Sequence, residues 1–148
     1  MKTYGIKILN GVNLDLLGTR EPHIYGAKDL MDLEKFLRDL LKKWSINHVE
    51  LSFFQSNQES EFLNSMTSSS DAMIINAGAW SHTSLAIADR LKAIHVPYIE
   101  VHLSNVFDRE TYRHHSWLSP RAVSVVSGGG FSAYSMALWG LIEHLRLS

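Results

Sequence analysis

Short β-rich runs alternate with stretches of helical periodicity along nearly the whole chain. Between Leu30 and Trp44 the apolar residues recur every three or four positions, which predicts a helix that packs one face on a sheet. Alternation of this kind favours right-handed parallel βαβ units. The predicted strands are Tyr4–Leu9, His48–Phe54, Ala72–Ile75, Tyr98–Leu103 and Ala122–Val126, and the predicted helices are Leu30–Trp44, Glu59–Met66, Thr83–Ala93 and Ser132–Leu145.

These elements predict a flavodoxin-like, doubly wound α/β fold. Its five-stranded parallel sheet would have the strand order 2-1-3-4-5, with helices on both faces. The apolar segments Ala72–Ile75 and Val123–Val126, the second interrupted only by Ser124, predict strands buried on both faces. A length of 148 residues, without repeats or linkers, favours a single domain over residues 1–148.

The composition excludes several classes of protein. Apolar residues make up 45% of the chain and charged residues 20%, which is enough to build a core and argues against disorder. Fourteen basic and fifteen acidic residues give a net charge of -1, which argues against a dedicated nucleic-acid binder. Without cysteine there is no disulfide, thiolate nucleophile or cysteine-bound metal. No apolar run is long enough to span a bilayer and the start lacks a signal-peptide pattern, so we expect a cytoplasmic protein.

Polar or glycine-rich residues follow every predicted strand. In an open parallel sheet, ligands bind outside the carboxyl ends of the strands. Each asparagine there is also an ordinary turn or cap residue, but five such ends together predict one polar binding site. The five segments are Asn10–Asn13, Gln55–Gln58, Asn76–Ala79, Glu100–Asn105 and Ser127–Gly130.

The segment Gly18–Gly26 lies between a strand and a helix and contains Arg20 and Tyr25. A glycine-bounded loop can act as a lid, and an arginine near a phenol favours the phenolate that a general base needs. The spacing is equally compatible with a surface loop whose tyrosine only packs.

Two histidines are candidates for function. His102 lies two residues after Glu100 on a predicted strand, so both side chains share one face. A carboxylate beside an imidazole orients the ring and favours its protonated form, which suits a general acid. His82 lies at a predicted helix start, where amide groups suit an anion or a hydroxyl. For His102, a buried structural histidine is the alternative.

Other chemistries find little support. No H-E-x-x-H spacing is present, so we expect no metal site, and both the dinucleotide fingerprint and the Walker A loop are missing. Gly128–Gly130 could cradle a phosphate, which leaves a nucleotide- or flavin-binding module as an alternative. A catalytically silent assembly protein is a third possibility. Trp80 and Trp117 adjoin the polar segments and either wall the pocket or pack in the core.

Several motifs, in order over nearly the whole chain, resemble type II 3-dehydroquinate dehydratase. Arg109–Glu110 and Arg113–Ser116 belong to this pattern, together with the loop Gly18–Gly26. The remaining motifs are Ile8–Leu14, Gln55–Asn57, Asn76–Ala79, His82–Ser84 and Glu100–Asn105.

The resemblance implies a lyase that converts 3-dehydroquinate to 3-dehydroshikimate by anti elimination through an enolate, without metal or cofactor. It implies Tyr25 as the proton acceptor, Arg20 as the residue that favours its ionised form, and His102 as the proton donor. Glu100 would orient His102, and Asn13 would hold a water that stabilises the enolate. The implied substrate-binding residues are Asn76, His82, Asp89, Leu103 through its backbone, Ser104 and Arg113.

The same resemblance implies a homododecamer built as a tetramer of trimers, in which a neighbouring subunit's acidic side chain helps to complete each site. It implies no membrane or nucleic-acid partner, and it fits both aromatic biosynthesis and quinate breakdown. The chain departs from the family pattern at Val12, where proline is usual, at Asp15, and at Trp80 and Trp117.

Overall fold

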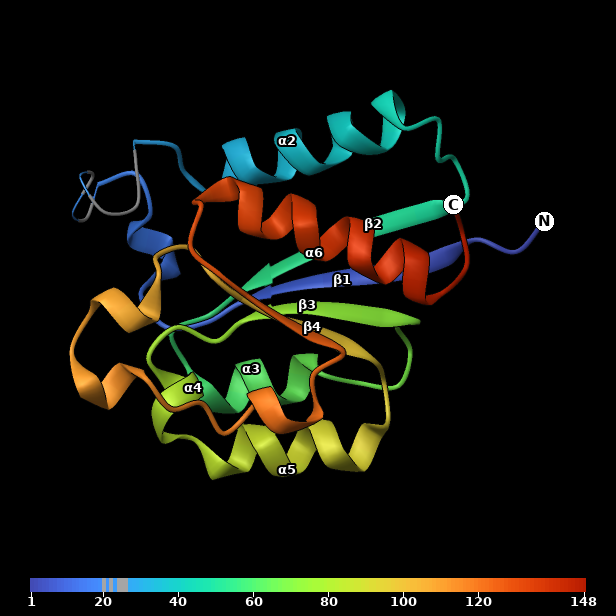
Figure 1. Ribbon diagram of the computed structural model, residues 1–148. Coiled ribbons are helices and arrows are strands. Elements are labelled where there is room, and N and C mark those ends of the chain that lie inside the picture. Colours follow the sequence, from blue (N-terminus) through green and yellow to red (C-terminus); the bar gives the residue numbers. More distant parts are fainter. Residues whose placement is uncertain (20, 22, 24–26) are drawn as a thin grey trace.

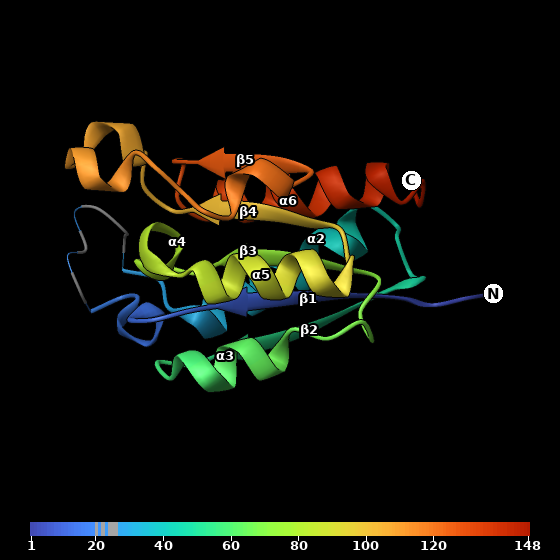
Figure 2. The same ribbon diagram turned by 90° about the horizontal axis from the view of Figure 1, so that it is seen from below.

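The protein contains one five-stranded parallel sheet, seen in a computed structural model that describes residues 1–19, 21, 23 and 27–148. The strands pair in the order β2-β1-β3-β4-β5, which confirms the predicted fold and strand order (Figure 2). Their bounds are Tyr4–Asn10 for β1, Val49–Gln55 for β2, Ala72–Asn76 for β3, Tyr98–His102 for β4 and Ser124–Ser127 for β5.

Helices cover both faces of the sheet (Figure 1). On one face lie α2, Leu30–Lys43, and α6, Phe131–His144. On the other lie α3, Glu59–Ser65, the short α4, Trp80–Thr83, and α5, Leu85–Ile94. No helix in the described part of the chain is long and apolar enough to cross a membrane.

The sheet separates two apolar cores. Side chains alternate between the faces along β1, so Ile8 packs with α2 and α6 while Leu9 packs against Phe62 and Ile87 on the other side. The central strands β3 and β4 are buried along their whole length. Both cores therefore hold the central strands rigidly, and with them the residues at their carboxyl ends.

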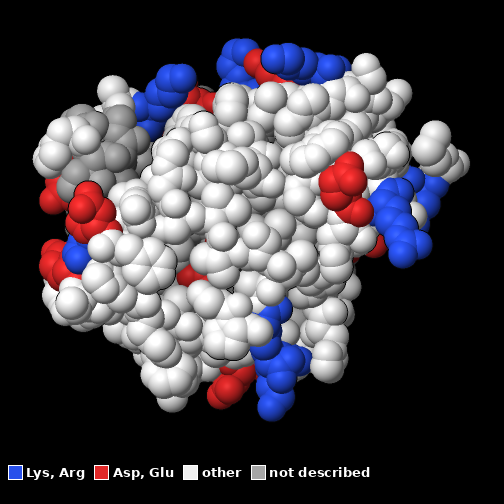
Figure 3. Space-filling view, in the orientation of Figure 1, with Lys and Arg blue, Asp and Glu red and all other residues white. Residues whose placement is uncertain are grey.

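Local sequence signals set the ends of α2. Asp29 and Asp32 form a capping box, with bonds of 2.9 and 3.0 Å between each side chain and the other residue's backbone N–H. Beyond the last turn, Ser45 adopts a left-handed conformation with φ of 58°. Lys and Arg side chains gather over α2 in the space-filling view (Figure 3). Pairs such as Lys35–Asp39 are exposed and contribute little to stability.

The predicted helix Thr83–Ala93 is wrong at its start. The chain turns at Ser84, so Thr83 ends α4 and α5 begins at Leu85. The Ser84 hydroxyl accepts a hydrogen bond from the Ile87 N–H at 3.1 Å and donates to Glu59 at 2.5 Å. This N-cap separates two helices that share one apolar pattern in the sequence.

The predicted burial of the last strand on both faces is also wrong. Within the described residues β5 pairs with β4 alone and is an edge strand. Val123 and Val125 are 42% and 44% exposed, while Val126 packs against the core on the α6 side. The apolar run reflects one buried face, and the strand begins at Ser124 instead of Ala122.

Candidate active site

A cavity of about 230 Å³ opens at the carboxyl edge of the sheet. Its residues come from the segments after β1, β3 and β4, as expected for an open parallel sheet. Most of the predicted site residues in the described part of the chain are among them. The lining residues are Val12, Asn13, Leu14, Leu16, Leu17, Asn76, Gly78, Ala79, His82, His102, Leu103, Ser104, Val106, Arg109 and Arg113.

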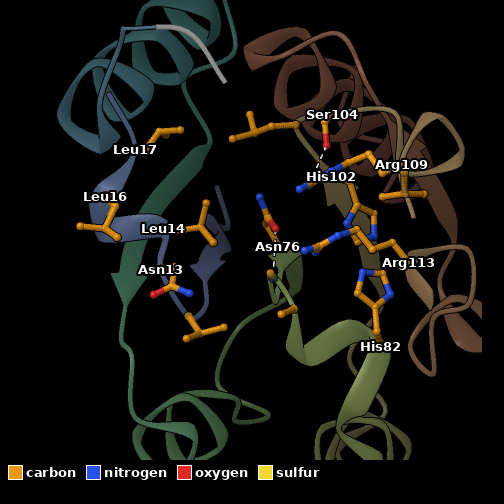
Figure 4. Close-up of a pocket in the computed structure, with 15 residues that line it drawn as sticks. Asn13, Leu14, Leu16, Leu17, Asn76, His82, His102, Ser104, Arg109 and Arg113 are labelled. Carbon is orange, nitrogen blue, oxygen red and sulfur yellow. Dashed lines mark hydrogen bonds between the residues drawn. The ribbon is translucent and has the colours of Figure 1, made fainter. Parts of the chain in front are cut away.

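The cavity has two chemically different walls (Figure 4). Three leucines from the turn after β1 form the apolar wall: Leu14, Leu16 and Leu17. The opposite wall carries His82, His102, Arg109 and Arg113, with Asn76 between the two walls. A small anionic molecule with hydroxyl groups suits this combination of charge, hydrogen-bonding groups and apolar contact.

The turn after β1 is held by backbone geometry. Asn13 adopts a left-handed conformation with φ of 68°, which asparagine tolerates better than most residues. Its N–H donates to the Asn57 side-chain oxygen at 2.8 Å, so the end of β2 supports it. A Cβ on Gly11 would lie 2.6 Å from the Ala77 carbonyl oxygen. Glycine is therefore required where the turns after β1 and β3 touch.

Glu100 and His102 form a buried pair beside the cavity. His102 Nε2 lies 2.5 Å from one carboxylate oxygen of Glu100, and the Ser119 hydroxyl donates to the other at 2.6 Å. Burial alone would raise the pKa of Glu100, but the hydrogen bonds from His102 and Ser119 outweigh it and hold that pKa below its usual value. An ionised carboxylate only accepts, so Nε2 of His102 carries a hydrogen and Nδ1 is the ring atom left for a ligand.

The imidazole of His82 packs on the imidazole of His102. The two rings stack with centroids 6.0 Å apart and planes 15° apart. His82 Nδ1 lies 2.7 Å from the His115 carbonyl oxygen and must donate to it. Burial lowers the pKa of His82, and the charges of His102 and Arg113 lower it further. A neutral His82 offers Nε2 as an acceptor. The prediction placed His82 at the start of the helix that follows it. The structure places it third in the four-residue helix α4, ahead of the separate helix α5.

A buried hydrogen-bond network joins the ends of β1 and β3 to α6. The Tyr134 hydroxyl donates to Asn10 Oδ1 at 2.5 Å and accepts from Asn76 Nδ2 at 2.9 Å. Asn76 Oδ1 in turn accepts from the Gly78 N–H at 3.2 Å. Tyr134 has no exposed surface, and burial raises the pKa of its phenol well above the usual value.

The segment after β4 carries two cavity arginines. Arg109 donates to the Ser104 hydroxyl at 3.4 Å, and Arg113 donates to Glu110 at 2.8 Å. A hydrogen bond from its own backbone N–H and one from Arg113 lower the pKa of Glu110 to about 2. The carboxylate therefore stays charged and holds the Arg113 guanidinium in place.

The described part of the chain does not place every predicted residue at the cavity. Arg20 and Tyr25 fall outside the described residues. Asp89 is exposed on α5 and is not among the cavity residues. Glu100 lies behind His102 and reaches the cavity only through it.

The tryptophans and the glycine run do not form part of the cavity. Trp80 packs on Phe62 with ring centroids 5.3 Å apart, and Trp117 contacts His115 at 4.7 Å. The N–H groups of Gly128 and Gly130 donate to the carbonyls of His102 and Leu103 at 2.9 Å. Those two amides are occupied within the protein, so neither is available to a phosphate.

The sequence did not point to Ser119, Tyr134 or the cavity residue Arg109 as site residues, nor to the apolar wall. Ser119 supports Glu100, and Tyr134 supports Asn76, but each is distant in the sequence from its partner. Among the described residues, no group of three or more His, Asp or Glu side chains is placed to hold a metal ion.

The fold and this site define a flavodoxin-like α/β protein with a polar cavity at the carboxyl edge of its sheet. The class II dehydroquinase family model matches residues 4–142, and the chain belongs to that family. A relative from Prochlorococcus marinus subsp. pastoris, called 3-dehydroquinate dehydratase, is 47% identical over 146 residues, covering 97% of this chain and 98% of its own.

Two crystal structures, both described as type II dehydroquinases, are similar along nearly the whole chain. The one from Butyrivibrio crossotus has a TM-score of 0.87 at 35% identity, with 94% of this chain and 97% of the other covered. The one from Propionibacterium acnes has the same TM-score and identity, with 96% and 98% covered.

Proposed function

We propose that this protein converts 3-dehydroquinate to 3-dehydroshikimate by eliminating water. The observation that carries the proposal is the Glu100–His102 pair, which is buried and presents an imidazole to the cavity of a dehydroquinase-family chain. The substrate is inferred from the relatives, which are called 3-dehydroquinate dehydratase. A polyhydroxylated carboxylate matches a cavity with two arginines, two histidines and an asparagine amide.

The elimination would run in two proton-transfer steps. Tyr25, as phenolate, takes a proton from the carbon beside the ketone, and an enolate forms; Arg20 favours the ionised tyrosine. His102 then donates a proton to the tertiary hydroxyl, which leaves as water on the opposite face while the double bond forms. Glu100 orients His102 and stabilises its positive charge, consistent with its buried, ionised carboxylate. Asn13 holds the water that stabilises the enolate.

The remaining predicted residues would bind the substrate. His82 would accept from a substrate hydroxyl through Nε2, and Arg113 would bind the carboxylate. Asn76, Ser104 and the backbone of Leu103 would complete the contacts. Because Asp89 is exposed on α5 and away from the cavity, its part in binding requires a neighbouring subunit. That requirement agrees with the proposed dodecamer, a tetramer of trimers.

The proposal includes residues 1–148 as one catalytic domain that works in the cytoplasm without metal or cofactor, in aromatic biosynthesis or quinate breakdown. A nucleotide- or flavin-binding module is disfavoured because the Gly128 and Gly130 amides are already bonded.

The test is an ultraviolet assay for the conjugated enone formed from 3-dehydroquinate. We expect turnover that survives treatment with borohydride in the presence of substrate, since no Schiff base forms. Tyr25→Phe should abolish turnover without changing the circular dichroism spectrum. Tyr4→Phe, on the first residue of β1, is the matched control. Absence of turnover by the well-folded wild-type protein, or near-normal activity of Tyr25→Phe, contradicts the proposal.

A further inference from the structure

The Asn76 amide lies in the cavity wall, yet Tyr134, which bonds it, comes from α6 and has no exposed surface. Asn10 at the other end of the network is 2% exposed and does not line the cavity. The three side chains meet where β1 and β3 end side by side, since Asn10 and Asn76 are register partners.

The direction of every hydrogen bond in this network follows from one backbone group. The Gly78 N–H can only donate, so the amide atom of Asn76 that faces it must be the oxygen. The Asn76 NH₂ then faces Tyr134, whose oxygen must accept. Tyr134 consequently uses its own hydrogen on Asn10 Oδ1.

This order leaves one hydrogen of the Asn76 NH₂ without an acceptor in the described part of the chain. If the Asn76 amide were rotated by half a turn, its NH₂ would face the Gly78 N–H, and two donors would meet. If the Tyr134 hydroxyl were rotated instead, its hydrogen would face a hydrogen of the Asn76 NH₂. Both alternatives leave buried donors unsatisfied, which costs about 1 to 3 kcal/mol per group.

We propose that Tyr134 is a positioning residue that fixes the Asn76 amide with its remaining N–H presented to the cavity. Asn76 then acts as a hydrogen-bond donor and selects an acceptor oxygen of the ligand, while His82 Nε2 selects a hydroxyl donor. The inference rests on the proposed function, because the ligand oxygen would belong to 3-dehydroquinate.

Kinetics of Tyr134→Phe test this role. The ring stays and only the hydroxyl is lost, so the Asn76 NH₂ loses its fixed partner. We expect the KM for 3-dehydroquinate to rise about tenfold, which corresponds to the contribution of one ordered hydrogen bond. The kcat should stay within about twofold, because Glu100 and His102 are untouched. A purely structural role would lower the melting temperature and leave KM unchanged.

A double-mutant cycle shows whether Tyr134 acts through Asn76. If it does, adding Tyr134→Phe to Asn76→Ala should change kcat/KM by less than about twofold. Additive losses would overturn the inference. Tyr98→Phe is the matched control: it removes the hydroxyl of another buried tyrosine, which bonds the Leu118 carbonyl and does not touch Asn76.

A second variant reaches the network from its far end. Asn10→Leu removes the acceptor of the Tyr134 hydrogen, frees the hydroxyl to turn towards Asn76, and should also raise KM. If Tyr134→Phe does not fold, Asn10→Leu decides the question. An unchanged KM in a folded variant overturns the inference while wild-type turnover still supports the function; no wild-type turnover overturns the function itself.

Discussion

The carboxylate of Glu100 and the imidazole of His102 lie 2.5 Å apart on one face of β4, where the strand reaches the cavity. The two residues are separated by one position, so the strand itself brings them together. Glu100 is fully buried and His102 is 8% exposed, so the ring is the only member of the pair that a ligand can contact.

Replacing the carboxylate of Glu100 tests whether its charge assists His102. Glu100→Gln keeps the shape and an acceptor for Nε2 but loses the charge that stabilises a protonated imidazole. We expect kcat to fall about 100-fold with little change in KM. Steady-state kinetics on 3-dehydroquinate measure this, with Glu50→Gln on the exposed face of β2 as control. A kcat equal to that of the wild type would contradict the orienting role of Glu100.

Ser119 tests the support of the buried carboxylate. Ser119→Ala removes a donor at 2.6 Å from Glu100, so the free energy of unfolding should fall by about 1 to 2 kcal/mol at pH 7. The pKa of Glu100 is lower in the folded state than its usual 4.5. Its stabilisation is therefore present above pH 4.5 and is lost as the pH falls through the folded value.

Urea unfolding at several pH values measures this difference, which should shrink in acid as Glu100 is protonated. Ser135→Ala, which removes a hydroxyl that donates to the Ser132 carbonyl on α6, is the control. A difference that stays constant down to the most acidic pH would show that Ser119 does not act through the charge of Glu100.

His82 should make stability sensitive to mild acid. Its pKa is lowered in the folded protein, so below the usual 6.5 the unfolded chain binds a proton that the folded protein resists. The free energy of unfolding should therefore decrease as pH falls below 6.5. His82→Asn keeps a donor for the His115 carbonyl but does not titrate, so its stability curve should be flatter there.

Chemical denaturation between about pH 5 and pH 7 compares the two proteins. His95→Asn is the control, because His95 is exposed at the left-handed end of α5, where asparagine is tolerated. Parallel curves for wild type and His82→Asn would contradict the assignment.

Gly11 tests the contact between the turns after β1 and β3. Gly11→Ala would place Cβ 2.6 Å from the Ala77 carbonyl oxygen, whereas Gly5→Ala would meet nothing closer than 4.0 Å. We expect Gly11→Ala to lower the free energy of unfolding by about 1 to 3 kcal/mol and to impair turnover, because Asn13 and Asn76 are displaced. Thermal melts and kinetics of both variants measure this. Equal behaviour of the two variants would be inconsistent with the close approach.

The fold was predictable because two periodicities alternate along the chain. The helical spacing between Leu30 and Trp44 matches α2, and the apolar run Ala72–Ile75 matches the buried β3. The edge position of β5 was not predictable, since Val123–Val126 is nearly as apolar as a central strand, with Ser124 as its one polar residue. The break at Ser84 was also hidden, because a capping serine does not interrupt an apolar pattern.

The site was predictable where it lies at strand ends, and the structure brings Asn76, His102 and Ser104 together as the topology requires. The residues that hold these side chains in place through hydrogen bonds were not predictable. Tyr134 lies 58 positions from Asn76 in a mostly apolar helix, where an aromatic residue is indistinguishable from ordinary core. Ser119 follows an irregular segment whose path no periodicity predicts.

The Gly78 N–H has a consequence for how readily this cavity can acquire another ligand preference. Gly78 has φ of 62°, and a Cβ there would lie 2.8 Å from the Val12 carbonyl oxygen, so the residue itself resists exchange. Because its N–H needs an acceptor from position 76, an asparagine there turns its NH₂ towards Tyr134, and a side chain with two acceptor atoms is needed to reverse that bond. Laboratory evolution towards a ligand with a donor at this point therefore has to pass through position 76 itself, where aspartate keeps the acceptor for the Gly78 N–H, whereas the opposite wall can change at either arginine.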